Sequence, residues 1–129
     1  MPFIFKTDAL LDAVAGEQIE ITEPAYYGGR AVFRGAEAFI WFSGTVQGLA
    51  WSAEVLRVDP PIGRLIPALV RLIDPAFPGA PGIAELMPFR DVRDGTALSG
   101  LSCKIYRHAH DKVAELTTEE ANLLRSYFA

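Results

Sequence analysis

The sequence predicts an α+β protein built on a small curved sheet or partly closed barrel, with a short helix at either end. Several segments in the first sixty residues have the alternation or the β-branched and aromatic composition of strands. Apolar residues at helical spacing appear near both ends of the chain. A length of 129 residues suits one domain, and no repeat or linker divides the chain. We therefore expect 1–129 to form a single domain.

The first part of the chain supplies two strands and a short helix. Residues 3–5 read as a strand. Thr7 is placed to cap a short amphipathic helix that Gly16 ends. The apolar face of this helix would be formed by Leu10, Leu11 and Val14. Residues 18–22 then alternate as a strand does, which predicts a second strand.

The middle of the chain is its most strand-like region. Segments 30–34, 38–42 and 49–58 are rich in residue types that favour strands, and glycine-containing turns separate them. Both sides of 38–42 are apolar, so this strand is predicted to be central and buried on both faces. Trp41 and Trp51 fall on neighbouring strands, where they could meet across the hairpin. The alternation of the returning strand places on one face Leu49, Trp51, Ala53 and Val55.

The next part of the chain is less regular. Residues 63–73 fit either a helix or a kinked edge strand, because prolines interrupt their helical spacing. The proline- and glycine-rich segment 74–83 is expected to be a surface loop. The pattern of residues 85–101 does not distinguish a helix from a strand. Short strands are predicted at 104–107 and 113–116.

The C-terminal end carries the clearest local signal. Thr117 and Glu120 have the spacing of a capping box, in which each side chain accepts a hydrogen bond from the other residue's backbone amide. An apolar stripe at helical spacing follows, formed by Ala121, Leu124, Tyr127 and Phe128. A C-terminal helix packed on the body of the protein is therefore predicted.

Composition and motifs argue against several functions. No apolar run is long enough to span a membrane, and the first residues lack a signal-peptide pattern. The sequence contains no P-loop, no Gly-x-Gly-x-x-Gly, no Gly-x-Ser-x-Gly and no cysteine pair for zinc. The lone Cys103 fits a reducing compartment. We expect a cytoplasmic binding module rather than an enzyme, without a cofactor.

Charge is distributed unevenly along a chain whose net charge is −4. This net charge opposes non-specific attraction to nucleic acid. Residues 57–112, however, hold eight bases against six acids, an excess of two positive charges. Most of the bases are arginine, which makes bidentate contacts with phosphate. A local basic patch is therefore expected, with Lys104 and Arg107 as candidates for phosphate contact.

His108 and His110 are the candidate ligands of an alternative metal site. On a strand, positions i and i+2 point the same way, so both imidazoles could reach one metal ion, with Asp111 or Glu115 nearby. The sequence gives no third ligand of known position. A small metal-dependent enzyme is therefore an alternative to the binding module.

Aromatic residues gather in the part of the chain that should form the sheet. They are Tyr26, Tyr27, Phe33, Phe39, Trp41, Phe42 and Trp51. One interpretation is core packing. The other is that some of them, with Tyr26 or Tyr27 from a glycine-flanked loop, wall a pocket that stacks a flat ligand such as a nucleobase.

Residues 35–58 resemble a known family. They contain GAEAFIWFS at 35–43 and GLAWSAEV at 48–55. The first has a glycine and acidic turn before an aromatic strand that ends at serine, and the second is a Gly-apolar strand that ends in Glu-Val. This pattern resembles the PUA-like superfamily, most nearly its EVE and ASCH branches. The resemblance implies a pseudo-barrel with flanking helices and a pocket at one end that holds nucleic acid or a modified base.

The resemblance also supplies candidate ligand-binding residues. Carried over position by position, they are Trp41, Ser43 and Trp51, with Tyr26 and Tyr27 in the loop before the sheet. In this hypothesis Trp41, Trp51 and Tyr27 stack, and Ser43 donates or accepts a hydrogen bond. The expected partners are RNA, DNA or a nucleotide-like small molecule, bound without catalysis.

A protein-interaction subunit with no small ligand is the remaining alternative. Exposed apolar surface on the 74–83 loop or beside a sheet edge would favour it.

Overall fold

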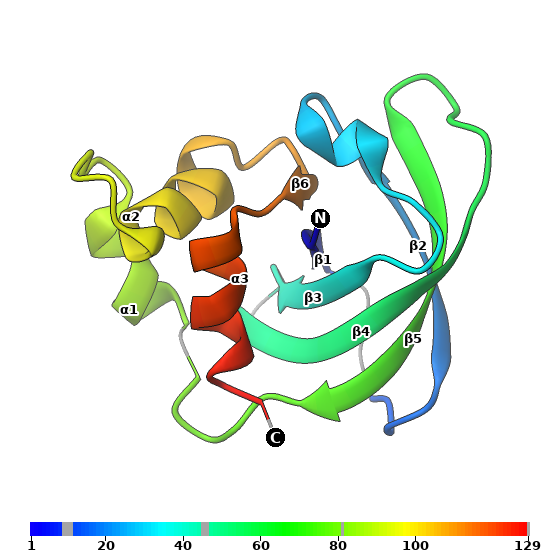
Figure 1. The fold of residues 1–129 in the computed structure, drawn as a ribbon, viewed down its shortest axis with the longest axis horizontal. Helices are drawn as coiled ribbons and strands as arrows, with labels where there is room; N and C mark the ends of the chain where they lie inside the picture. Colours follow the sequence, from blue (N-terminus) through cyan, green and yellow to red (C-terminus); the bar gives the residue numbers. More distant parts are fainter. Residues whose placement is uncertain (9–11, 45–46, 81, 129) are drawn as a thin grey trace.

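The structure is a computed structural model, and it describes residues 1–8, 12–44, 47–80 and 82–128. Its main feature is a curled mixed sheet of six strands (Figure 1). The strands are β1 (Phe3–Thr7), β2 (Gln18–Pro24), β3 (Glu37–Phe42), β4 (Gly48–Val58), β5 (Leu65–Pro75) and β6 (Val113–Glu115). Their order in the sheet is β2-β5-β4-β3-β1-β6. Only β1 and β3 pair in parallel; the other neighbouring strands pair antiparallel.

Helical segments gather on one side of this sheet (Figure 1). They are α1 (Ile83–Leu86), the 3-10 helix η2 (Met87–Phe89), α2 (Ala97–Ser102), the π-helix η3 (Cys103–Arg107) and α3 (Thr118–Arg125). A separate 3-10 helix, η1 (Gly28–Ala31), lies between β2 and β3 in the sequence. The predicted α+β class with a curved sheet is confirmed.

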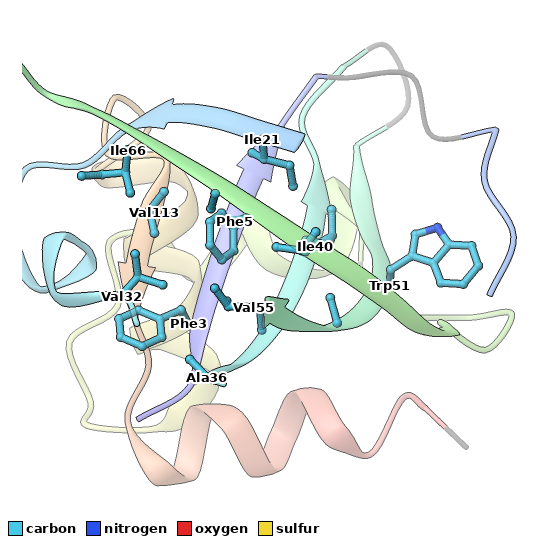
Figure 2. Close-up of a cluster of buried hydrophobic side chains, with 14 of the residues drawn as sticks. Phe3, Phe5, Ile21, Val32, Ala36, Ile40, Trp51, Val55, Ile66 and Val113 are labelled. Atoms are coloured by element: carbon cyan, nitrogen blue, oxygen red, sulfur yellow. The ribbon is translucent and has the colours of Figure 1, made fainter. Parts of the chain in front are cut away.

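The sheet buries apolar side chains on both of its faces. Phe3 and Phe5 of β1 belong to a cluster that also holds Ile21 of β2 and Val55 of β4 (Figure 2). Since β1 and β2 are far apart in the strand order, this cluster lies inside the curl. Ile4 of β1, the residue between the two phenylalanines, packs on the opposite face with the helices.

The strand β3 confirms the predicted central position. It pairs with β4 on one side and β1 on the other. Ile40 points into the curl, while Phe39 and Trp41 pack under the helices. All three are at most 1% exposed. Burying a side chain of this size contributes about 1.5–3 kcal/mol, so β3 is a main source of stability.

The prediction that Trp41 and Trp51 meet across the hairpin is wrong. The β3–β4 register shifts between Ile40 and Trp41, so Ile40 lies opposite Trp51 and Trp41 lies opposite Leu49. Ala50 is the extra residue of this bulge, and an extra residue changes which face the following side chains occupy. Trp51 shares a face with its partner Ile40, which points away from the adjacent Trp41, so the two indoles lie on opposite faces of the sheet. The bulge puts Leu49 on the same face as Trp41, so Leu49 does not share a face with Trp51.

The segment 63–73, for which the sequence allowed either a helix or a kinked edge strand, forms β5. This strand is an interior strand and not an edge strand. It lies between β2 and β4. Pro67 is tolerated because it lies one residue before the stretch of β5 that pairs with β4, which begins with the pair Ala68 and Val58. The carbonyl of Pro67 still accepts a hydrogen bond from the amide of Asp59 at 2.9 Å. The missing N–H of proline therefore interrupts no ladder bond to β4.

Three further predictions differ from the structure. The strand expected at 30–34 is replaced by η1 and a turn, and the strand expected at 104–107 is the π-helix η3. Thr7 belongs to β1 and does not cap a helix, and residues 12–14 are not helical. The predicted helix residues Leu10 and Leu11 lie outside the described residues. The short strand expected at 113–116 is confirmed as β6.

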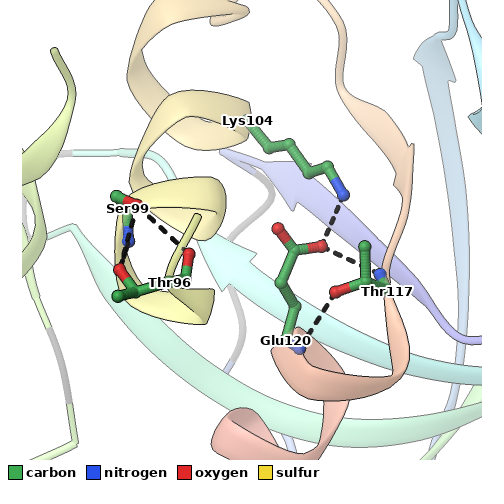
Figure 3. Close-up of polar contacts among 5 residues, drawn as sticks. All are labelled: Thr96, Ser99, Lys104, Thr117 and Glu120. Carbon is green, nitrogen blue, oxygen red and sulfur yellow. Dashed lines mark hydrogen bonds and ion pairs between the residues drawn. The ribbon is translucent and has the colours of Figure 1, made fainter. Parts of the chain in front are cut away.

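The capping box of α3 is confirmed (Figure 3). Thr117 Oγ1 accepts a hydrogen bond from the Glu120 amide at 3.2 Å, and Glu120 Oε1 accepts one from the Thr117 amide at 2.9 Å. Ala121 and Leu124 are fully buried against the sheet. The helix ends at Arg125, so Tyr127 and Phe128 pack on the same cluster from beyond its C-terminus.

Candidate functional site

A pocket of about 490 Å³ lies between the end of β2, the segment η3 and the strand β6. This volume falls within the range typical of small-molecule sites. Its principal lining residues are Tyr27, Gly28, Cys103, Lys104, His108, Asp111 and Glu115. We refer to it as the Tyr27 pocket. Three separate stretches of sequence contribute to it, so only the folded chain brings them together.

Two glycines bring η1 against β6 beside the Tyr27 pocket, and Gly28 lines the pocket itself. Gly29 is buried, and a Cβ on it would lie 1.7 Å from the carbonyl oxygen of Val113 in β6. A Cβ on Gly28 would lie 3.1 Å from Oε2 of Glu115. The absence of side chains at both positions therefore lets η1 lie directly against β6. This contact fixes the position of the preceding residue, Tyr27.

Tyr27 is the aromatic residue of the pocket. Its side chain is 59% exposed, and its ring meets the His108 ring edge to face at a centroid distance of 5.6 Å. Tyr26 makes a different set of contacts, with His110 at 4.9 Å and with the Arg64 guanidinium at 4.9 Å above its ring. Tyr26 does not line the Tyr27 pocket. An exposed aromatic face at a pocket is a suitable surface for stacking a flat ligand.

Two carboxylates line the same pocket. Asp111 is 4% exposed, and its Oδ1 accepts a hydrogen bond from the Tyr26 amide at 2.9 Å. This bond holds the turn that carries both tyrosines. Neither Asp111 Oδ2 nor the Glu115 carboxylate has a hydrogen-bond or ion-pair partner within the described part of the chain. These oxygens are available to accept hydrogen bonds from a ligand.

The Lys104 ammonium is already engaged. It forms an ion pair with Glu120, which is 3% exposed (Figure 3). Glu120 also caps α3, so a single carboxylate joins the start of α3 to the pocket wall. Gly100 allows this arrangement, because a Cβ there would meet Glu120 Oε2. Lys104 lines the pocket, but its positive charge is already compensated by the Glu120 carboxylate.

Lys6 supports the pocket wall from inside the protein. It is 1% exposed, and its ammonium donates hydrogen bonds to the carbonyl oxygens of Lys104 and His108, the latter at 2.9 Å. A side chain of β1 therefore holds both ends of η3. Burial, and secondarily the nearby charge of Lys112, lower the pKa of Lys6 from 10.5 to about 8, although Asp111 opposes this shift.

We expect the stability of the protein to rise between pH 8 and pH 10.5. In this window the unfolded chain keeps the Lys6 proton while the folded protein loses it, so the cost of burying the charge disappears as the pH increases. The difference between the folded and unfolded pKa values of Lys6 corresponds to a gain of about 3 kcal/mol in the free energy of unfolding. Urea unfolding at a series of pH values measures this free energy for the protein and for Lys6→Met. The variant should show no increase in stability between pH 8 and pH 10.5.

The variant Lys112→Met is the matched control. It removes only the second cause of the lowered Lys6 pKa, so most of the rise in stability should remain. An unchanged pH dependence in Lys6→Met would contradict the account. Above pH 10 another group acts in the opposite direction, because burial raises the pKa of Tyr106 to about 12.

An arginine-rich surface adjoins the Tyr27 pocket. A second hollow of about 440 Å³ is lined in part by Arg90, Arg93 and Arg107, and it shares Cys103 with the Tyr27 pocket. We call these three arginines the arginine rim. Asp91 partly neutralises the rim, since its carboxylate lies 2.9 Å from Arg107 and 3.5 Å from Arg90. Surface ion pairs of this kind are weak and a phosphate can compete for them.

The helix α2 beside the rim has a well-fixed start. Thr96 caps it, with its side chain accepting from the Ser99 amide at 3.3 Å (Figure 3). Asp94 accepts hydrogen bonds from the Ser99 hydroxyl and from the hydroxyl and amide of Thr96. These bonds lower the pKa of Asp94 to about 2. The loop that leads from the rim into α2 is thus anchored to the helix.

The structure brings together only some of the predicted site residues. Tyr27 and Lys104 line the Tyr27 pocket, together with His108 of the alternative metal site. Arg107 belongs to the adjoining rim, and Tyr26 lies beside the pocket.

The remaining candidates do not line the Tyr27 pocket. Trp41 is fully buried, with the Tyr106 ring edge-on at 6.3 Å. Trp51 lies inside the curl. The Ser43 amide donates to the carbonyl of Thr7 at the end of the parallel β1–β3 pair. The indoles act as core residues, which is the simpler of the two interpretations of the aromatic cluster.

The role of the glycines and the acidic wall of the pocket were not predicted from the sequence. Gly28 and Gly29 were interpreted only as a turn before the strand expected at 30–34, and Asp111 and Glu115 only as neighbours of a metal site. The paired glycines of the Tyr-Tyr-Gly-Gly pattern were the available signal for a close contact between two backbone segments. Nothing in the sequence shows that the second segment is β6.

The metal alternative receives no support from the described residues. The His108 and His110 rings lie 6.3 Å apart between centroids, and each packs against a different tyrosine. No group of three or more His, Cys, Asp or Glu in the parts of the chain that the structure covers could hold a metal ion.

Comparison with known proteins gives one informative match. No family model matches the chain, and no curated protein matches its sequence significantly. Among solved structures, the chain is similar to the DUF55 domain of human thymocyte nuclear protein 1, with a TM-score of 0.70 and 16% identity. The match covers 98% of this chain and 97% of that chain. At this identity the likeness shows the fold alone, and it confirms the predicted PUA-like fold.

A search of the described residues finds no helix with the length and apolarity needed to cross a membrane.

Proposed function

We propose that this chain is a single PUA-like domain that binds single-stranded nucleic acid or a nucleotide, with one base in the Tyr27 pocket. The observation that carries the proposal is the position of an exposed tyrosine ring at the mouth of a 490 Å³ pocket. Stacking of a base on such a ring contributes about 1–3 kcal/mol. The similarity to an EVE domain supports the same class of ligand.

The arginine rim provides the second part of the proposed site. A base held in the Tyr27 pocket has its sugar and phosphate outside, and the rim adjoins the pocket through Cys103. Arg107 and Arg93 supply guanidinium groups, which suit phosphate oxygens. In this proposal Lys104 positions the pocket wall through Glu120, and Arg107 contacts phosphate.

No catalytic step is part of the proposal, and RNA and DNA are both candidate ligands. A cytoplasmic location remains part of the proposal. The free thiol of Cys103 is consistent with a reducing compartment.

The direct test is fluorescence anisotropy with labelled single-stranded RNA and DNA oligonucleotides and with the matching duplexes. We expect saturable binding of single strands and weaker binding of duplexes, because a paired base cannot enter the pocket without being unstacked. Absence of binding to every oligonucleotide and nucleotide at low salt would overturn the proposed function.

The salt dependence of binding should report the arginine rim. Each phosphate contact on a single strand contributes about 0.7 to the slope of log K against log salt concentration. Arg107→Ala should lower the slope by about this amount and weaken binding. Asp91→Asn should act in the opposite direction, because it frees Arg107 and Arg90 from their carboxylate.

Arg34→Ala is the control for the rim. Arg34 is an exposed arginine in the turn before β3, and it lines neither the Tyr27 pocket nor the hollow at the rim. An equal effect of Arg34→Ala and Arg107→Ala would mean that the protein attracts nucleic acid through its overall charge and not through the rim.

A protein-interaction role is the second candidate, favoured by apolar exposure at and beyond the end of β5. Ile73 is 43% exposed and Phe77, in the proline-rich segment, is 48% exposed. Light scattering distinguishes the two roles in part: a stable dimer that Phe77→Ser dissociates would support an interaction surface here, and a monomer would count against self-association.

A further inference from the structure

We propose that Asp111 and Glu115 make the Tyr27 pocket selective for guanine. This inference rests on the proposed function, and it adds the identity of the base. It follows from the polar groups that the pocket offers to a ligand and from the hydrogen-bonding edges of the four bases.

The pocket offers acceptors to a ligand. Of its charged lining residues, Lys104 is paired with Glu120, whereas the Glu115 carboxylate and Asp111 Oδ2 have no partner among the described residues. A carboxylate oxygen accepts hydrogen bonds and cannot donate them. The buried ammonium of Lys6 donates to the backbone carbonyls of Lys104 and His108, so it does not supply a donor to a ligand in the pocket. A ligand that fits must therefore bring N–H groups to Asp111 and Glu115.

Guanine is the base whose Watson–Crick edge presents adjacent donors. Its N1–H and N2 amino group lie side by side, so guanine can donate to two acceptors, one on Asp111 through Oδ2 and one on Glu115. Adenine and cytosine each place a ring nitrogen acceptor beside their amino group, and this lone pair would face a carboxylate oxygen. Uracil presents one N–H between two carbonyl oxygens. Facing acceptors repel, and an unpaired carboxylate in a partly buried site loses hydration without compensation.

The geometry of the pocket is consistent with a purine. Tyr27 is 59% exposed, and its ring makes a T-shaped contact with the His108 ring at 5.6 Å between centroids. Asp111 is fixed by its bond to the Tyr26 amide, so its carboxylate is held in place before a ligand arrives. Such preorganisation lowers the entropic cost of binding.

Isothermal titration calorimetry with the 5′-monophosphates of guanosine, inosine, adenosine, cytidine and uridine tests the inference. Guanosine monophosphate should bind at least about tenfold more tightly than the adenosine, cytidine and uridine compounds, as expected for a good bidentate contact. Inosine monophosphate has the same ring and phosphate but lacks the N2 amino group. Its affinity should therefore fall between that of guanosine monophosphate and those of the other three.

Two variants identify the acceptors. Glu115→Gln and Asp111→Asn should each remove most of the preference for guanosine over inosine, because each replaces one carboxylate oxygen with an amide donor. Asparagine keeps an oxygen that can accept from the Tyr26 amide, so the turn should survive. Glu54→Gln is the matched control, since it removes one negative charge from β4, outside the pocket, and should leave the preference unchanged.

The outcomes separate the two proposals. Equal affinity for all five nucleotides, or a preference that both pocket variants retain, would overturn the selectivity for guanine and leave the nucleic-acid-binding function standing. Absence of binding to every nucleotide and every oligonucleotide would overturn both.

Discussion

Replacing Tyr27 with alanine should weaken the binding of single-stranded nucleic acid by roughly 5- to 150-fold, the equivalent of about 1–3 kcal/mol of base stacking. The ring is exposed and makes its described ring contact with His108 alone, so its loss should cost little folding stability. Tyr27→Phe keeps the stacking face and should bind nearly as the parent protein does. Fluorescence anisotropy titrations measure both affinities.

The neighbouring tyrosine provides the control. Tyr26 is also partly exposed, but it packs with His110 and Arg64 outside the Tyr27 pocket. Tyr26→Ala should therefore change the affinity by less than Tyr27→Ala. If Tyr26→Ala has the larger effect, the ligand binds on the Arg64 side and the pocket has been misassigned.

Gly29→Ala should destabilise the fold strongly, on the order of 3 kcal/mol. The new methyl group would overlap the carbonyl oxygen of Val113, and backbone cannot move aside as a flexible side chain can. Either η1 or β6 must shift, and both form the pocket. Urea unfolding should show a lower free energy of unfolding, and the variant should bind nucleic acid poorly even where it remains folded.

Gly28→Ala is the matched variant one residue away. Its methyl group would lie 3.1 Å from Oε2 and 3.2 Å from Cβ of Glu115. The carboxylate can rotate away, and a shift of a few tenths of an ångström relieves the contact with Cβ. The free energy of unfolding should change by less than about 1 kcal/mol, while the narrowed pocket should lower the affinity for a nucleotide. If the two alanine variants are equally stable, the close contact between η1 and β6 is not a constraint on the fold.

The predictable part of the fold is the part that local patterns determine. β3 is recognisable because apolar residues on both sides require burial on both faces. α3 is recognisable because the capping box and the apolar stripe agree. Both features need only a few consecutive residues, so the sequence alone is sufficient for them.

The remaining parts of the fold depend on contacts between distant segments. The pairing of Trp51 with Ile40 separates Trp51 from Trp41, and the bulge at Ala50 separates Leu49 from Trp51. A period-two pattern reveals neither the register nor an inserted residue. η3 looked like a strand, but Lys6, about a hundred residues earlier in the chain, donates to the carbonyls at both of its ends. Pro67 suggested an edge strand, and the structure tolerates it inside the sheet because pairing with β4 stops there.

The candidate site was predictable in its residue types but not in its location. Tyr27, Lys104 and Arg107 were identified as an aromatic and two bases suited to a nucleotide, and the structure places them at one pocket and its adjoining rim. The indoles were predicted for the same pocket from the resemblance to EVE domains and from their places on neighbouring strands, but both are core residues. The acidic wall was missed, since Asp111 and Glu115 reach the pocket only through the turn after η3 and the strand β6.

The central claim is that the Tyr27 pocket receives a base, and an NMR titration tests it most directly. Amide chemical shifts of the ¹⁵N-labelled protein would be followed while a single-stranded RNA hexanucleotide containing guanosine is added. The account predicts that the largest changes fall at residues 27–29, 103–108 and 111–115, with smaller ones at Arg90 and Arg93 of the arginine rim. Changes confined to another surface, such as the turn between β4 and β5, would contradict it.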